Sequence, residues 1–334
     1  MVAKNKKPPK ILDCIAIGDT TLDVFLKVND SGDGSETCHI DKDNKLLCFG
    51  LGDKIPVEKL TYVPAVGNAA NHAFGVKRLG LSTAIYSYLG NDVAGQQSLE
   101  VFKEEGINTD YMQTVEGATN YSTVINNNGE RTILVYHEHR NYDLPEIPPA
   151  RFAYFSSLAA GHEELHKDIP EYVKKYDVKL GFNPGSFQLR EGVDVLRPIL
   201  GATHVLFVNR DEAQTLVGKS DDIKTLTTHL HELGPEIVAI TDGKNGSYAS
   251  DGGRVYFLDI FEAPLVERTG AGDSYASGFI GALAHGHDIK EAMRWGTVNS
   301  ASVIQYIGAR EGLLKKEDIE STLAKHMSFQ PNEI

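Results

Sequence analysis

The segment 269–273 reads Thr-Gly-Ala-Gly-Asp and precedes an apolar stretch with helical spacing over 276–284. Small residues at a helix start allow successive backbone N–H groups to point at one anion, and the helix dipole favours negative charge there. A transferring phosphate is such an anion, and Asp273 is suited to take a proton from an attacking hydroxyl. The alternative is structural: Asp273 caps the helix and the glycines form a tight turn.

A second polar pair, Asn68 and Asn71, lies at the start of a helix expected over 69–79. Residues three apart on a helix share a side. Amides both donate and accept hydrogen bonds, as neutral sugar hydroxyls require. The alternative is an Asn cap followed by a surface amide.

Further polar groups stand where predicted strands end. They are Asn183, Asn209 with the nearby Glu212, and the turn 241–246. In open α/β sheets ligands bind at the carboxyl ends of the strands, so these groups fall on the expected active edge. Glu212 is suited to hold Mg²⁺ through water or to pair with a lysine, and the turn also suits a plain hairpin connection.

The elements that must position these groups alternate between strand and helix. We expect strands over 11–17, 83–88, 152–156, 179–183, 203–209 and 237–241, with a hairpin over 246–258. We expect helices over 69–79, 93–105, 164–176, 193–200 and 210–217, and from 274, 289 and 316. Repeated βα units predict an α/β fold with a mostly parallel sheet covered by helices on both faces.

The chain also carries material for a second, smaller sheet. Short alternating segments in 21–66 indicate small antiparallel hairpins, and the segments 122–126 and 132–136 form another around Asn127-Asn128-Gly129. Phe279 and Trp295 stand at helical positions and are expected in the core.

Composition excludes several classes of function. The 334 residues are 41% hydrophobic and 24% charged, with a formal charge of −13. This balance is typical of a globular protein and disfavours nucleic acid as a ligand. No apolar run reaches about 18 residues, so no membrane span is expected. Three cysteines without a CxxC pair fit a reducing, cytoplasmic location, and the basic segment 1–10 is expected to be a disordered tail.

His137, His139 and Arg140 follow the second hairpin and, with Arg131, are suited either to a phosphate or carboxylate on a ligand or to a solvated strand end. A zinc site at His137 and His139 lacks a third ligand nearby in the sequence.

Taken in order, these segments resemble the ribokinase or PfkB family of carbohydrate kinases over nearly the whole chain. The amino-terminal signature is matched by 67–80 and 89–95, and the carboxyl-terminal signature by 269–273. The resemblance implies a three-layer α/β/α ribokinase-like sandwich over 11–334. It also implies a small β-sheet lid, formed by about 21–66 and 118–140, that closes on the acceptor, excludes water and often supplies a homodimer interface.

The resemblance also assigns roles position by position. Asp273 looks like the catalytic base, and Gly270, Ala271 and Gly272 like the anion hole for the γ-phosphate. The positions that match sugar-binding residues are Asp23, Gly67, Asn68 and Asn71. The positions that match the surroundings of ATP and Mg²⁺ are Asn183, Asn209, Glu212, Thr241, Gly243, Gly246 and Thr269, with Asn299 beside the adenine.

Three departures from the family pattern bear on substrate and cofactors. Val66 replaces the first glycine of a usual Gly-Gly pair, and no carboxylate stands near Ala159, where ribokinases carry a Glu. Glu267 replaces the Asp of the family's monovalent cation site, so K⁺ activation stays open. The acceptor is expected to be a small sugar, with a nucleoside kinase as the alternative and a catalytically silent sugar or nucleotide sensor as the alternative of another class.

Overall fold

The computed structural model describes residues 11–28, 39–41, 46–127 and 130–334. The expected tail over 1–10 and the turn at Asn128-Gly129 therefore lie outside the described residues. The strands are β1 Leu12–Ile17, β2 Thr21–Val28, β3 His39–Asp41, β4 Leu46–Cys48, β5 Val57–Val66, β6 Thr83–Tyr86, β7 Tyr88–Gly90, β8 Gln113–Val115, β9 Asn120–Asn127, β10 Glu130–Tyr136, β11 Ala150–Phe155, β12 Lys179–Phe182, β13 Thr203–Asn209, β14 Ile237–Thr241, β15 Ser247–Ser250, β16 Val255–Leu258 and β17 Asn332–Glu333.

The helices are α1 Asn68–Arg78, α2 Val93–Glu104, α3 Leu165–Tyr176, α4 Ser186–Glu191, α5 Val193–Leu200, α6 Arg210–Val217, α7 Ile223–His231, α8 Ala271–Ala284, α9 Ile289–Val303 and α10 Lys316–Lys325, with the short 3₁₀ helix η1 at Gly243–Asn245. The predicted helices are all present, and the structure adds α4 and α7. No helix among the described residues is long and apolar enough to cross a membrane.

The central sheet, counted over the described ranges, has nine strands in the order β17-β16-β15-β14-β13-β12-β11-β1-β6. The pairs from β6 through β14 are parallel, and β15, β16 and β17 extend the sheet with antiparallel pairs. The expectation of a mostly parallel sheet is confirmed. Because the parallel strands point the same way, their carboxyl ends share one edge of the sheet.

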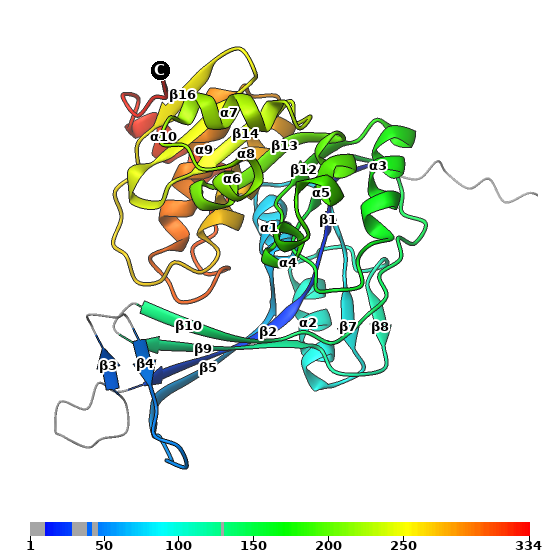
Figure 1. The fold of residues 1–334 in the computed structure, drawn as a ribbon, viewed down its shortest axis with the longest axis vertical. Helices are drawn as coiled ribbons and strands as arrows, with labels where there is room; N and C mark the ends of the chain where they lie inside the picture. Colours follow the sequence, from blue (N-terminus) through cyan, green and yellow to red (C-terminus); the bar gives the residue numbers. More distant parts are fainter. Residues whose placement is uncertain (1–10, 29–38, 42–45, 128–129) are drawn as a thin grey trace, which may run out of the picture.

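The inner strands are apolar on both faces, and alternate side chains pack on opposite helix layers. On β13, Leu206 and Val208 face one core cluster while Val205 and Phe207 face the other. The first cluster takes side chains from α3, α5, α6 and α7, and the second from α1, α8, α9 and α10. Three layers result, as expected (Figure 1). Phe279 and Trp295 lie in the second cluster, where the sequence predicts them.

A second sheet in the order β10-β9-β2-β5 projects from the layered body (Figure 1). Its strands fall within 21–66 and 118–140, which the sequence assigns to the lid, and we call this four-stranded sheet the lid. The expected antiparallel pairs are present within 21–66 and within 120–136, and a parallel pair joins these two segments. Strand β2 pairs in parallel with β9 and antiparallel with the ten-residue β5, while β4 pairs with β3.

Candidate active site

The predicted site residues gather at the carboxyl edge of the central sheet. Asn183 follows β12, Asn209 ends β13, and Thr241 ends β14. Helices α1 and α8 bring Asn71 and Asp273 to the same edge. The residues singled out along the chain are therefore neighbours in space, as the parallel topology requires.

Asp273 stands in the first turn of α8, and its side chain is buried. The N-cap, Gly270, has φ 78°, and no side chain caps the helix. A Cβ at Gly270 would lie 2.3 Å from the Cβ of Ala309, so both the backbone angle and the packing require glycine. The first N–H groups of an α-helix have no carbonyl partner within the helix, which leaves the amides of this turn suited to an anion.

Two asparagines of α1 connect this turn to the sheet. The Asn71 amide donates to Asp273 Oδ2 at 2.8 Å, and the Asn68 amide donates to Asn183 Oδ1 at 3.1 Å. Asn183 in turn donates to the carbonyl of Phe207 at 2.8 Å. The amide pair at the start of α1 therefore makes specific polar contacts, and is not a cap with a surface neighbour.

Gly67 precedes α1 and approaches the backbone closely. Its φ is 111°, and a Cβ there would lie 2.5 Å from the carbonyl oxygen of Asp19. Glycine at this position therefore sets the distance between the start of α1 and the end of β1.

Burial perturbs the carboxyl groups of the site. It raises the pKa of Asp273 to about 6, against the opposing hydrogen bond from Asn71. It also raises the pKa of Asp23 on β2 to about 6, opposed by a hydrogen bond from Ser122 and reinforced by the charge of Glu267. A carboxyl group whose pKa lies near 6 is poised to exchange a proton at neutral pH.

A cleft of about 740 Å³ opens beside the start of α8. Predicted positions among its lining residues are Asn209, Thr241, Gly243, Gly246, Ala271 and Gly272. A Cβ at Gly272 would meet no atom within 4 Å, in keeping with its place on the open wall of the cleft. Lys244 and Arg268 also line the cleft and add positive charge beside the start of α8.

Asn209 and Glu212 form a capping box at the start of α6. Asn209 Oδ1 accepts from the Glu212 amide, and Glu212 Oε2 accepts from the Asn209 amide, both at 2.9 Å. Burial raises the pKa of Glu212, and the charge of Asp273 adds to the shift. Because a divalent cation beside two mutually repelling carboxylates would offset that repulsion, the donor set fits Mg²⁺ held by oxygen atoms.

Asn299 does not line the cleft. Its side chain is fully buried, donates to the Ser274 carbonyl at 2.9 Å and accepts from the Leu314 amide at 3.0 Å. Its contacts join α9 to α8 and to the loop before α10, while its helix neighbours Ser300 and Ala301 line the cleft. The structure therefore places the Asn299 side chain in the interior and not on the cleft wall.

Thr269 also forms its hydrogen bonds with another residue of the protein. Its amide and hydroxyl both donate to Glu267 Oε1, at 2.9 and 2.6 Å. The same carboxylate is paired with Arg131 of the lid strand β10. Arg131 therefore contacts the segment that leads into α8, rather than standing at a solvated strand end.

Sequence reasoning overlooked Asp19. The carboxylate is buried at the end of β1, where it accepts from the Tyr142 hydroxyl at 2.7 Å and from the Ala159 amide at 2.8 Å. His137 Nδ1 lies 3.6 Å from the same group. The available signal is its place directly after the apolar strand 11–17, the same signal that picks out Asn183 and Asn209.

Comparison with known proteins agrees with this arrangement. Residues 40–316 match the family described as "pfkB family carbohydrate kinase". An uncharacterized sugar kinase of Archaeoglobus fulgidus is 31% identical over 253 residues, which cover 73% of this chain and all of that protein. An ATP-dependent 6-phosphofructokinase of Thermoanaerobacterium thermosaccharolyticum is 27% identical, over 76% of this chain and 83% of that protein.

Solved structures share the fold. A putative ribokinase from Agrobacterium tumefaciens superposes with a TM-score of 0.78 at 22% identity, covering 96% of this chain and 99% of that one. Arabidopsis thaliana ribokinase, solved with ribose and ATP, gives a TM-score of 0.76 at 20% identity, over 94% and 99% of the two chains. The fold, the gathered residues and the family match agree, and the chain belongs to the pfkB family of carbohydrate kinases, phosphotransferases that act on a hydroxyl acceptor.

Proposed function

We propose that this kinase transfers the γ-phosphoryl group of ATP to a hydroxyl of a small sugar or sugar-like acceptor, with Asp273 as the catalytic base. The observation that carries the proposal is the buried Asp273 carboxylate in the first turn of α8, held by Asn71, with a pKa raised by burial to about 6. At neutral pH this group is largely deprotonated and can take the hydroxyl proton as the new P–O bond forms.

The cleft beside α8 is the proposed ATP site. Thr241, Gly243 and Gly246 on its sheet side and Ser300 and Ala301 on its helix side leave room for a nucleotide between them. When bound, MgATP supplies the phosphoryl group and its metal offsets phosphate charge. Glu212 would hold the magnesium ion through water, because its carboxylate is close enough to Asp273 for the two charges to interact.

Charge that develops on the transferred phosphate is stabilised in this proposal by Gly270, Ala271 and Gly272. Their amides open the positive end of α8, the end of a helix that binds anions. Arg268 and Lys244 on the cleft wall add full positive charges. Pre-oriented donors of this kind commonly provide the largest share of rate enhancement.

The acceptor is assigned to the space between α1 and the lid. Asn68, Asn71 and Asp23 offer amide and carboxylate groups, which match sugar hydroxyls. Gly67 lets the start of α1 lie against the backbone of Asp19, whose side chain is a second buried carboxylate at the end of β1. Lid closure over the acceptor would exclude water, which otherwise takes the phosphoryl group.

A homodimer through the lid is part of the proposal. The lid carries an unusual number of exposed large apolar side chains, namely Leu60, Tyr62, Tyr121, Ile133, Leu134, Val135 and Tyr136. Exposed apolar side chains on both faces of a projecting sheet suit a surface that a second copy of the chain covers.

The test is ADP release from MgATP against a panel of acceptors. The names of similar proteins suggest fructose 6-phosphate, fructosamine, 5-dehydro-2-deoxygluconate, ribose and a nucleoside set. We expect one sugar acceptor to stimulate wild type and not Asp273→Asn. Stimulation by nucleosides alone would overturn the sugar assignment and favour the nucleoside kinase. If no acceptor stimulates ADP release and the protein still binds ATP, the result would favour the catalytically silent sensor.

A further inference from the structure

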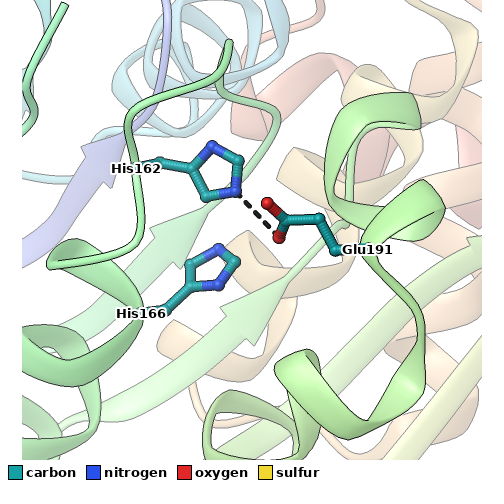
Figure 2. Close-up of side chains that lie close together, drawn as sticks. All are labelled: His162, His166 and Glu191. Carbon is teal, nitrogen blue, oxygen red and sulfur yellow. Dashed lines mark hydrogen bonds and ion pairs between the residues drawn. The ribbon is translucent and has the colours of Figure 1, made fainter.

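Two histidines and a glutamate converge outside the nucleotide cleft. His162 and His166 lie before and at the start of α3, and Glu191 ends α4. One ligand atom from each residue lies within 4.8 Å of the other two. Figure 2 shows the two imidazole rings one above the other, with the Glu191 carboxylate facing them from the opposite element. We call these three residues the His-His-Glu cluster.

The sequence places the two histidines at a spacing that metal sites use. Residues 162–166 read His-Glu-Glu-Leu-His, and side chains four residues apart near a helix start lie on one side. Two such histidines with a distant Glu form one of the ligand sets that bind zinc. Glu163, between them, is exposed and takes no part in the cluster, so the arrangement suits binding and not hydrolysis.

The hydrogen bonds around His162 leave one of its ring nitrogens facing a carboxylate. Its Nδ1 donates to the Ala159 carbonyl, which leaves Nε2 facing Glu191 Oε2 at 3.1 Å. Because two lone pairs repel, that gap must hold either a proton or a metal ion. An imidazole whose other nitrogen donates to a backbone carbonyl is the usual form of a metal ligand.

His166 supports the metal alternative. The ring is 5% exposed, and its Nδ1 has no hydrogen-bond partner among the described residues. Its Nε2 lies 3.3 Å from the Gln188 amide nitrogen, a contact too long to fix the ring proton on Nδ1.

We propose that His162, His166 and Glu191 bind a transition metal ion of the zinc class. Ligand atoms of a tetrahedral zinc ion lie about 3.3 Å apart, as bond lengths of about 2.0 Å dictate. The pair His162–Glu191 already has this spacing at 3.1 Å, and Glu191, with 28% of its side chain exposed, is free to adjust toward His166.

A metal ion here would join two loops of the active edge. The loop after β11 contains Ala159, whose amide holds Asp19, and α4 follows Asn183. Gly185 and Ser157 already pack so closely that a Cβ at Gly185 would lie 2.3 Å from the Ser157 Cβ. The ion would therefore fix the acceptor side of the site without touching the reacting atoms.

The test is metal binding by the full chain, freed of any affinity tag and stripped with EDTA. Titration with zinc chloride, followed by calorimetry, should give one site per chain, and Co²⁺ should give the visible absorption of a tetrahedral site. Glu191→Gln and His166→Gln should each weaken zinc binding at least about 10-fold, as loss of a ligand or its support does. Excess Mg²⁺ should not displace zinc, because it prefers oxygen ligands.

His204→Gln is the matched control. His204 and Glu236 form an ion pair with 2.9 Å between Nδ1 and Oε2, a His–Glu pair that belongs to no three-ligand group among the described residues. The zinc affinity of His204→Gln should equal that of wild type. The proposal is overturned if stripped wild type takes up no zinc, or if Glu191→Gln and His166→Gln bind it as wild type does; the cluster would then be a buried ion pair.

Discussion

The guanidinium of Arg131, on the lid strand β10, lies 2.7 Å from the carboxylate of Glu267, in the segment that leads into α8. The same carboxylate oxygen accepts from the amide and hydroxyl of Thr269. The second oxygen, Oε2, is buried without a partner among the described residues. Glu267 is thus held jointly by the lid and by the turn that forms the proposed anion hole, and the position of the lid is coupled to the position of that turn.

Arg131→Met should therefore impair both stability and catalysis. Glu267 has only 2% of its side chain exposed and Arg131 has 30%, so loss of Arg131 takes one strong hydrogen-bond partner from a buried carboxylate and costs about 2 kcal/mol. We expect the free energy of unfolding, measured in urea, to fall by about that amount and kcat/KM to fall with it.

The matched control for Arg131→Met is Lys27→Met on the same sheet. Lys27 and Glu58 form an ion pair at 2.8 Å, but both side chains are about half exposed, so its loss should change little. If Arg131→Met and Lys27→Met behave alike, the lid and the anion hole are not coupled through Glu267.

The pH profile should report Asp273. Its pKa of about 6 predicts that kcat falls tenfold per pH unit below about pH 6, because only the carboxylate accepts a proton. Asp23 has a similar pKa, so the two must be separated. Asp23→Asn should raise KM for the acceptor and keep the acid limb of kcat. An acid limb that disappears in Asp23→Asn would assign the titration to Asp23 instead.

Burial of the Asp273 carboxylate should also lower the free energy of unfolding at neutral pH. The folded-state pKa is raised from 3.8 to about 6, so protonation favours the folded state, and stability is lost as pH rises through that interval. Asp273→Asn removes the buried charge while its amide can still pair with Asn71. We compare the free energy of unfolding of the variant with that of wild type at pH 7 and at pH 4. This difference should be up to about 3 kcal/mol more in favour of the variant at pH 7 than at pH 4.

Urea unfolding of both proteins at the two pH values measures this gain. A variant that is no more stable relative to wild type at pH 7 than at pH 4 would show that the carboxylate is well solvated in the folded state. The result is independent of the kinase assay, so it tests the environment of Asp273 even before an acceptor is known.

The βα alternation and the strand-end groups could be predicted because both are local patterns. The helices at 193–200 and 210–217 have the predicted bounds, and Asn183 and Asn209 lie at the predicted edge. The six-residue α4 and the helix α7 escaped notice, since each is short and lies in a polar stretch. Register between distant strands, such as the parallel pairing of β2 with β9, leaves no mark in a local pattern.

In the candidate site, too, contacts between distant segments could not be predicted from the sequence. Asn71 could be selected as a polar group at a helix start, but its partner Asp273 lies far along the chain, and only the fold shows the bond between them. Asn299 was assigned to the nucleotide by resemblance, yet the rotation of α9 turns it into the protein and turns Ser300 toward the cleft. A rotation of α9 by one residue position decides which of the two side chains faces the cleft, and that rotation depends on how α9 packs against α8.

Substitution of Asn299 should therefore lower stability, whereas substitution of Ser300 should impair ATP binding. Asn299→Ala leaves the Ser274 carbonyl and the Leu314 amide without their partner, and buried groups left unsatisfied cost about 1 to 3 kcal/mol each. We expect a lower free energy of unfolding with KM for ATP unchanged. Ser300→Tyr should instead narrow the cleft, raise KM for ATP severalfold and leave stability near that of wild type, since Ser300 is partly exposed. An Asn299→Ala protein of normal stability with a raised KM for ATP would reverse the assignment and return Asn299 to the nucleotide.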